Sequence, residues 1–314
     1  MPFETIHRLA LAHSSQLPFR CLLANQAQGI VQICHGLAEH SARYQRFAAA
    51  LSYAGYHVYA HDHRGHGVNI DANTPKGMFA LRDGHRAAIN DVLALNTYIH
   101  QSHPGLPIIL FGHSMGGLIA LNYILDHAAT VDATAMWNTN VSSQLENRTA
   151  LALLYMERML KGSDVPSAML PKLTFRAWGN AIADKRTDFD WLSRDTQEVD
   201  AYIADPLCGF DASVSMWIDI FRMMQRGLVR DNFANIPKNM PFHFLGGGAD
   251  PATNNGKAVQ RLAARMQHMG FTDVDCVIQS ETRHESLNEC NHDQSVQIFL
   301  DWLRKNLPSA AFSR

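Results

Sequence analysis

The sequence predicts a single α/β domain with a mostly parallel central sheet, helices on both faces of that sheet, and an inserted helical cap. Short β-rich apolar runs alternate with stretches whose apolar residues recur at helical spacing, a pattern typical of parallel strands joined by helices. The alternation stops near residue 140 and resumes near residue 240. The chain has 314 residues, 46% of them hydrophobic, which is enough for one large core.

The first half of the domain contains four expected strands separated by helices. The strands are expected at residues 30–34, 56–60, 108–111 and 133–137, where short apolar runs occur. Apolar residues at positions 44, 47, 48 and 51 recur at helical spacing, so we expect a helix that Ser41 caps and Gly55 ends. Further helices are expected at residues 89–99 and 116–126.

The same alternation resumes after the cap. Strands are expected at residues 241–246 and 273–278, and helices at residues 259–269 and 296–303. Within the cap, residues 151–160 and 216–224 are helical stretches rich in large apolar side chains. We therefore expect a first core part at residues 1–140, a cap at residues 141–231 and a second core part at residues 232–314.

Charge and hydropathy exclude several classes of protein. The 27 Lys and Arg against 29 Asp and Glu leave a net charge of −2, whereas nucleic-acid binding requires a strongly basic domain or face. No window approaches the roughly 18 consecutive apolar residues of a membrane span, and the start of the chain lacks an export signal. The five cysteines form an odd set with no Cys-x-x-Cys pair, which favours a reducing compartment. From charge, hydropathy and cysteines together we expect a cytoplasmic protein that binds no nucleic acid.

Residues 112–116 form a G-x-S-x-G motif between an expected strand and an expected helix. A serine at such a sharp turn is held in strained backbone geometry with its hydroxyl exposed, and the flanking glycines allow the chain to fold back. Ser114 is therefore a candidate nucleophile. Alternatively, the small residues serve only to pack the helix against the sheet.

A serine nucleophile requires a histidine base that a carboxylate orients, and in this architecture both follow the serine in the sequence. His284 lies in the loop after the last expected strand, and Asp250 lies in a glycine-rich turn after the preceding strand. Both positions are at the carboxyl ends of parallel strands, where α/β folds gather their ligands. Asp273, Asp275 and His292 are the nearest rivals, and Asp250 could instead be a turn residue.

The negative charge of a tetrahedral intermediate requires backbone N–H donors. One donor is expected from Met115, directly after the nucleophile, and the second from the loop after an early strand. Leu37 is the candidate in that loop, where His35 is expected to act as a structural hydrogen-bonding residue rather than a proton carrier.

Four motifs together resemble the monoacylglycerol lipase and lysophospholipase group of α/β hydrolases. They are HGLAEH at residues 35–40, DHRGHG at 62–67, GHSMGG at 112–117 and RHESLNE at 283–289. The resemblance implies a triad of Ser114, Asp250 and His284, an oxyanion hole at Leu37 and Met115, and hydrolysis of single-chain acyl esters of glycerol or glycerophosphodiesters. Residues 141–231 match no motif of the group, and this cap normally decides the substrate.

The chain has 17 histidines, a number that could indicate a metal site, but their positions argue against one. Several belong to the motifs just named, and the histidines of residues 61–66 do not have a zinc-type ligand spacing. We expect no metal and no other cofactor, because serine hydrolysis requires neither. Asp62 and Arg64 are expected to stabilise their loop through charge-assisted hydrogen bonds.

The second apolar helix of the cap is expected to face the acyl chain of the substrate. It carries Met216, Trp217, Ile220 and Phe221, and flexible thioethers adapt to variable apolar ligands. The same helix could contact the inner face of a membrane, where lipid substrates lie. The first helix, at residues 151–160, is expected to be ordinary core.

These features together predict a serine carboxylic-ester hydrolase that uses an acyl-enzyme on Ser114 and acts on a small lipid-like ester. A thioesterase or peptidase on the same scaffold is the first alternative. The second is a non-catalytic binding protein that uses the pocket only to hold a ligand, although such a protein would need no nucleophile, base, acid and oxyanion loop together.

Overall fold

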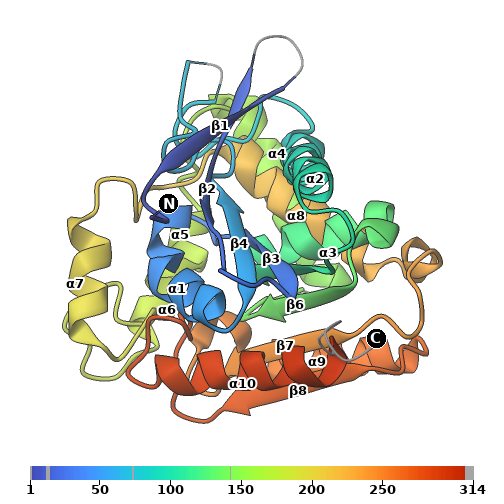
Figure 1. Ribbon diagram of the computed structural model, residues 1–314. Helices are drawn as coiled ribbons and strands as arrows, with labels where there is room; N and C mark the ends of the chain where they lie inside the picture. Colours follow the sequence, from blue (N-terminus) through green and yellow to red (C-terminus); the bar gives the residue numbers. More distant parts are fainter. Residues whose placement is uncertain (1, 12–14, 73, 142, 308–314) are drawn as a thin grey trace.

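The computed structural model describes residues 2–11, 15–72, 74–141 and 143–307. In this part of the chain one eight-stranded sheet has the order β1-β2-β4-β3-β5-β6-β7-β8 (Figure 1). The strands are β1 (Ile6–Ala10), β2 (Gln16–Leu22), β3 (Gly29–Cys34), β4 (Tyr56–His61), β5 (Ile108–His113), β6 (Ala133–Trp137), β7 (Phe242–Gly247) and β8 (Val274–Gln279). The strands from β4 to β8 in this order pair in parallel, whereas β1 and β2 form an antiparallel edge.

Helices cover both faces of the sheet. They are α1 (Gln45–Tyr53), α2 (Gly84–Ser102), α3 (Met115–His127), α9 (Lys257–His268) and α10 (His292–Asn306). The helices α1 and α10 pack on one face, and α2, α3 and α9 pack on the other. Because both faces are covered, the central strands β3 to β7 are buried along their whole length. The predicted α/β fold class is confirmed.

The cap segment lies between β6 and β7. It contains α4 (Gln144–Lys161), α5 (Leu170–Leu173), α6 (Phe175–Asn180), α7 (Thr196–Ala204) and α8 (Val214–Leu228). A capping box of Ser143 and Glu146 begins α4, and α8 packs against α4, α3 and α2. The division into two core parts and a cap at residues 141–231 stays a prediction.

The first half of the chain differs from expectation in two places. Ser41 does not cap α1, because a short 3₁₀ helix (Ser41–Tyr44) precedes it and Tyr44 occupies the N-cap position. The edge strands β1 and β2 were not predicted, since β1 alternates exposed and half-buried residues without a long apolar run. Gly55 follows α1 with a φ of 88°, a conformation that suits glycine after a helix.

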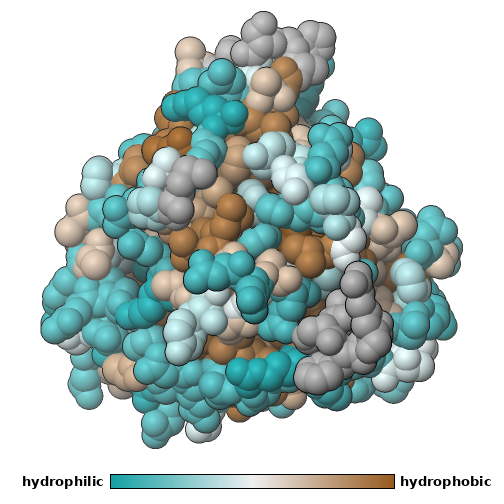
Figure 2. Space-filling view, viewed as in Figure 1, coloured by the Kyte–Doolittle hydropathy of each residue, from teal (hydrophilic) through white to brown (hydrophobic). Residues whose placement is uncertain are grey.

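The outer surface is mixed in character. On the face viewed, hydrophilic residues cover most of the surface and hydrophobic residues gather in smaller patches near its middle (Figure 2). Among the helices that the structure describes, none combines the length and the hydropathy that crossing a membrane requires.

Candidate active site

Ser114 stands at a sharp turn between β5 and α3. Its backbone has a φ of 54° and a ψ of −116°, a strained conformation for a residue with a side chain. The glycines on either side are required for close approach: a Cβ on Gly112 would overlap the carbonyl of Gly116, and a Cβ on Gly116 would overlap the carbonyl of Cys34. The turn therefore places the serine at the carboxyl end of the sheet, beside the loop that follows β3.

His284 and Asp250 meet Ser114 at this end of the sheet. His284 Nε2 lies 2.9 Å from Ser114 Oγ, and His284 Nδ1 lies 2.9 Å from Asp250 Oδ2. The Asp250 carboxylate is fully buried and also accepts hydrogen bonds from Ala252 N and Thr253 Oγ1. Burial by itself raises the pKa of Asp250, but the charge of His284 and these hydrogen bonds outweigh it and hold the pKa below its ordinary value.

The rival residues lie elsewhere. Asp275 lies on β8 and pairs with Lys305 at 3.0 Å. His292 begins α10 and donates from Nδ1 to the carbonyl of Glu289 at 2.9 Å. Asp273 accepts the amide of Phe242 through its backbone carbonyl. None of these three lines the cavity that contains Ser114.

Leu37 and Met115 line the same cavity as Ser114. The loop that carries Leu37 is fixed by His35, which donates from Nδ1 to Gly36 O at 2.8 Å and accepts the amide of His63 on Nε2 at 2.9 Å. His35 is therefore placed as a hydrogen-bonding residue of the loop. The amide of Gly36 is already engaged by Glu39, so it does not point to a substrate.

A buried ionic network that was not predicted lies directly beside His284. Glu39 Oε1 accepts from Gly36 N at 2.5 Å and from Tyr44 Oη at 2.9 Å, and it faces His113 Nδ1 at 3.3 Å. The other ring nitrogen of His113 lies 3.0 Å from the backbone carbonyl of His284. Burial lowers the pKa of His113, but the hydrogen bond and charge of Glu39 outweigh it and raise the pKa above its ordinary value.

Arg43 completes this network. It binds Glu285 through two hydrogen bonds of 2.5 and 2.7 Å and binds Glu39 at 3.1 Å. The guanidinium therefore joins the loop after β3 to the residue that directly follows His284 in the chain. Bidentate pairs of this kind fix geometry as well as charge.

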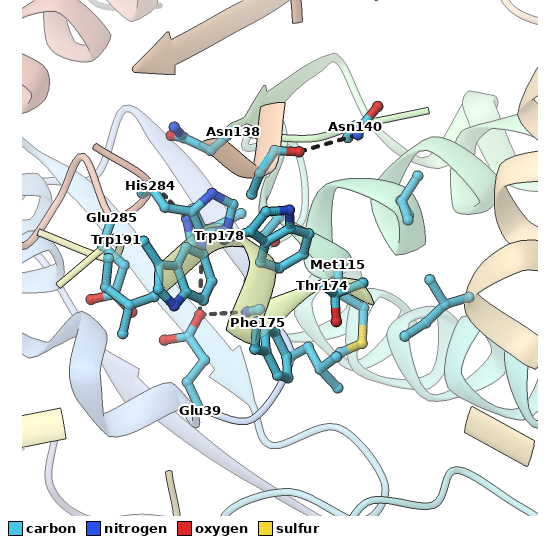
Figure 3. Close-up of a pocket in the computed structure, with 18 of the residues that line it drawn as sticks. Glu39, Met115, Asn138, Asn140, Thr174, Phe175, Trp178, Trp191, His284 and Glu285 are labelled. Atoms are coloured by element: carbon cyan, nitrogen blue, oxygen red, sulfur yellow. Dashed lines mark hydrogen bonds and ion pairs between the residues drawn. The ribbon is translucent and has the colours of Figure 1, made fainter. Parts of the chain in front are cut away.

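The cavity in front of Ser114 has a volume of about 180 Å³ and a wall that is largely apolar and includes several aromatic side chains. Cap segments provide Phe175, Trp178, Trp191, Trp217 and Phe221 to this wall. Figure 3 shows Phe175, Trp178 and Trp191 gathered around the site, and the rings of Trp191 and His284 are 5.0 Å apart. Trp178 and Trp191 were not predicted, because they lie in short helices and turns without a helical apolar stripe.

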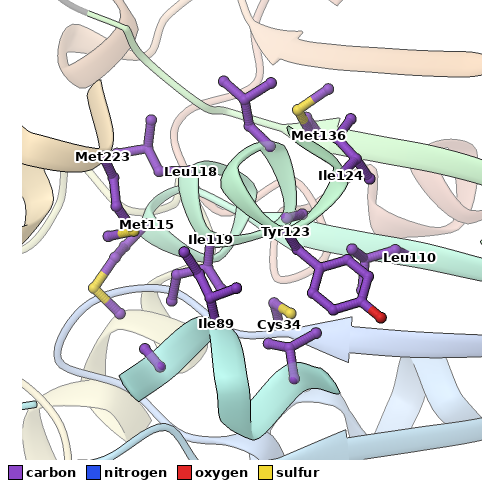
Figure 4. Close-up of a cluster of buried hydrophobic side chains, with 14 of the residues drawn as sticks. Cys34, Ile89, Leu110, Met115, Leu118, Ile119, Tyr123, Ile124, Met136 and Met223 are labelled. Atoms are coloured by element: carbon purple, nitrogen blue, oxygen red, sulfur yellow. The ribbon is translucent and has the colours of Figure 1, made fainter. Parts of the chain in front are cut away.

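The helix α8 has two apolar faces with different neighbours. Trp217, Ile220, Phe221 and Met224 share the face that lines the cavity. Met216 lies at the edge of this face, is fully buried in the core and is not among the residues that line the cavity, so its assignment to the substrate site is corrected. On the core side, Figure 4 shows Met223 beside Leu118 and Met115 of α3.

Potential metal ligands also gather in the described residues. His40, Asp205 and Cys208 have ligand atoms within 4.8 Å of one another. His40 Nε2 and Asp205 Oδ2 already bind each other at 2.8 Å, so this group has a hydrogen-bonded structure of its own. In the loop after β4, Arg64 binds Asp91, whereas Asp62 accepts the amides of Ser41 and Val68.

Comparison with known proteins gives one family and several lipases. The family model described as serine aminopeptidase, S33, matches residues 25–291. The human monoglyceride lipase is 29% identical over 225 residues, which cover 71% of this chain and 65% of that protein. The monoacylglycerol lipase of Mycolicibacterium smegmatis is 32% identical over 180 residues, which cover 57% of this chain and 56% of that protein. The chain thus spans less than two thirds of the length of these relatives.

Solved structures resemble the whole chain. A thermostable carboxyl esterase from Bacillus coagulans, solved in complex with glycerol, superposes with a TM-score of 0.83 at 22% identity and covers 96% of this chain and 98% of its own. The monoacylglycerol lipase of Paleococcus ferrophilus has a TM-score of 0.70 at 21% identity, with 93% and 100% covered. At this level of identity the likeness concerns the fold.

Proposed function

The chain belongs to the serine aminopeptidase S33 family of α/β hydrolases, and on that premise we propose that it is a serine carboxylic-ester hydrolase. Its substrates are single-chain acyl esters of the monoacylglycerol or lysophospholipid type. The observation that carries the proposal is the pair of 2.9 Å hydrogen bonds from Asp250 through His284 to Ser114. The monoglyceride lipases among its relatives support the substrate class.

In the proposed mechanism His284 Nε2 takes the proton of Ser114 while Ser114 Oγ attacks the acyl carbonyl. The amides of Leu37 and Met115 stabilise the resulting oxyanion. His284 then returns the proton to the leaving alcohol, and an acyl ester remains on Ser114. A water molecule, deprotonated by His284, attacks this ester and releases the fatty acid. Asp250 orients His284 and stabilises its charged form.

The charges around the cavity favour a neutral ester over the amino group of a peptide. Glu39 and Glu285 are the carboxylates beside Ser114 on the cavity wall, and an aminopeptidase would need a free carboxylate for the substrate's ammonium group. Arg43 already binds both of them, and His113 also faces Glu39. The aromatic part of the wall, in contrast, suits an acyl chain.

We further propose that residues 141–231 act as a lid and that α4 brings the protein into peripheral contact with a membrane. Trp217 is buried and Phe221 lines the cavity, so α8 is not the contacting helix. Large apolar side chains that are exposed lie on α4 instead: Leu145, Met156, Met159 and Leu160. The last turn of α4 also carries the basic residues Arg158 and Lys161. Because apolar side chains next to basic ones suit an anionic membrane surface, a cytoplasmic location at the inner membrane face is proposed with this contact.

Labelling and hydrolysis test the proposed chemistry. A fluorophosphonate probe is expected to form an adduct on Ser114, and Ser114→Ala is expected to lower the turnover number by about four to six orders of magnitude without loss of fold. Ser52→Ala, at a half-buried site on α1, is the control. The substrate panel includes monoacylglycerols, lysophospholipids, thioesters and amino-acyl amides. Near-normal hydrolysis by Ser114→Ala, or no adduct in the wild type, would contradict the proposal.

A further inference from the structure

The three residues at the end of β6 contact the serine turn, Asp250 and the residues on either side of His284. The carbonyl of Trp137 accepts the amide of Ser114 at 2.8 Å. Thr139 Oγ1 donates to the carbonyls of Ser114 and Trp137 at 3.3 and 3.1 Å. Two of the three residues therefore hold the backbone of the serine turn. The residue between them, Asn138, binds Asp250 and the two neighbours of His284 in the chain.

Asn138 is buried and uses both atoms of its side-chain amide. Its Nδ2 donates to Asp250 Oδ2 at 3.2 Å and to the carbonyl of Arg283 at 3.4 Å, and its Oδ1 accepts from Ser286 Oγ at 2.8 Å. This orientation is required, because an ionised carboxylate can only accept a hydrogen bond and must therefore face the nitrogen. Ser286 is itself fully buried.

These contacts fix the two groups that determine the position of the His284 ring. Asp250 Oδ2 is the oxygen that also binds His284 Nδ1, so the Asn138 bond fixes the partner of the ring. Arg283 and Ser286 stand on either side of His284 in the chain, so the same amide also holds the loop from which the ring projects.

The backbone at Asn138 fits this role. Its φ is 49°, in the left-handed region that few residues with side chains occupy and that asparagine tolerates best after glycine. Strain of this kind persists only where surrounding structure determines it, and it gathers at functional sites. Here the unusual φ brings the amide into the space between the Asp250 turn and the His284 loop.

We propose that Asn138 is a positioning residue that aligns Asp250 and His284 with Ser114. This role rests on the proposed function, because the alignment matters only if His284 transfers the proton of Ser114. A shift of about 1 Å at such a site can cost about a hundredfold in rate. Asn138 acts through Asp250 and His284 and needs no contact with the substrate.

The test compares Asn138→Ala with Asn138→Gly, which removes the same amide but relieves the backbone at a positive φ. Both are expected to lower kcat by about 10- to 100-fold with little change in KM. In both, the low-field NMR signal of the proton between His284 Nδ1 and Asp250 Oδ2 is expected to weaken or move. Ser286→Ala, which releases Oδ1 of the amide, is expected to change the same quantities by a smaller amount.

Two matched variants separate positioning from stability. Asn96 is another buried asparagine, bound to Gln32, and Ser295 is another fully buried serine, bound to Gln279. Asn96→Ala and Ser295→Ala are expected to lower stability but to keep kcat and the NMR signal. The positioning role is overturned if folded Asn138→Ala and Asn138→Gly keep both quantities at the wild-type level, or if the matched variants lose as much. Since the NMR signal needs no substrate, it tests the role even if the wild type hydrolyses no ester, a result that would contradict the proposed function alone.

Discussion

At the scale of single residues, Arg43 joins two parts of the site that no local sequence pattern connects. Its guanidinium compensates two buried carboxylates, Glu39 and Glu285, one on each side of the site. Burial alone raises the pKa of Glu285, and the charge of Arg43 outweighs it and holds the pKa below its ordinary value. Removing one partner of a buried ion pair leaves an uncompensated charge, which costs far more than the net contribution of the pair.

Arg43→Met is therefore expected to lower the free energy of unfolding by about 3–5 kcal/mol, since two carboxylates then face each other without a cation. Urea unfolding at neutral pH measures this change. Arg304→Met is the control, because the pair of Arg304 with Asp301 is 58% and 62% exposed and exposed pairs contribute little. Equal stability of the two variants would show that the Arg43 network is not a source of stability.

Sequence patterns could select Ser114, Asp250 and His284 as candidates because each follows a strand and lies in a short motif. It could not identify Arg43 or Asn138 as members of the site, because their partners are distant in sequence. Arg43 and Glu285 are 242 positions apart, and Asn138 and Asp250 are 112 apart. Only the order of strands in the sheet brings such pairs together, and no local pattern contains that order.

At the scale of secondary-structure elements, α4 is notable because large apolar side chains are exposed on its outer face. Leu151 and Leu154 face the core, whereas Met159 and Leu160 are 86% and 85% exposed. The expectation of ordinary core at residues 151–160 thus holds for one face of this helix. An apolar outer face on a lid is the feature on which the proposed membrane contact depends.

Met159→Ser with Leu160→Ser is expected to weaken binding to anionic phospholipid vesicles by about tenfold or more, since burying each large apolar side chain is worth about 1.5–3 kcal/mol. Co-sedimentation with the vesicles measures this. Tyr53→Ser is the control, because Tyr53 is 97% exposed but lies on α1, in the core part. Unchanged binding by the α4 variant would remove the membrane contact, and hydrolysis of a soluble short-chain ester is expected to stay normal in both variants.

The elements themselves were predicted to different degrees. The strands β3 to β8 were predicted within one or two residues of their observed bounds, and burial on both faces explains why β3 to β7 are short apolar runs. The helices α2 and α10 instead extend three to five residues beyond the expected ranges at each end. The helices α5 and α6 were not predicted, since they have too few turns for a periodic stripe, and α7 was not predicted because it buries only Val199 and Tyr202. In α8 the stripe is so wide that sequence could not show which apolar face lines the cavity.

At the scale of the whole molecule, a group of buried histidines links stability to pH. His61 ends β4 and lies together with His63 and His66 of the loop that follows, and all three are buried. Burial lowers the pKa of His61 to about 3 and that of His66 to about 3. An unfolded histidine has a pKa of about 6.5, so between these values the unfolded chain binds protons that the folded chain does not.

The free energy of unfolding is therefore expected to be highest above about pH 6.5 and to fall as the pH decreases toward 4, by about 1.4 kcal/mol per pH unit for each such histidine. Urea unfolding at pH 7, 6 and 5 measures the slope. His61→Leu is expected to make the slope shallower, because both ring nitrogens of His61 lack a hydrogen-bond partner among the described residues. A variant with the wild-type slope would show that His61 does not contribute to it.

The strands β6 and β7 are neighbours in the sheet, although the helices α4 to α8 separate them in the sequence. The whole segment from Asn138 to Pro241 leaves the sheet after one strand and returns in the next. Closing a flexible loop becomes harder only with the logarithm of its length, by about 0.6 kcal/mol for each doubling. A longer, shorter or rebuilt segment can therefore replace this one while the strand ends that carry Ser114, Asp250 and His284 keep their places. New substrate ranges can thus evolve on an unchanged chemical centre.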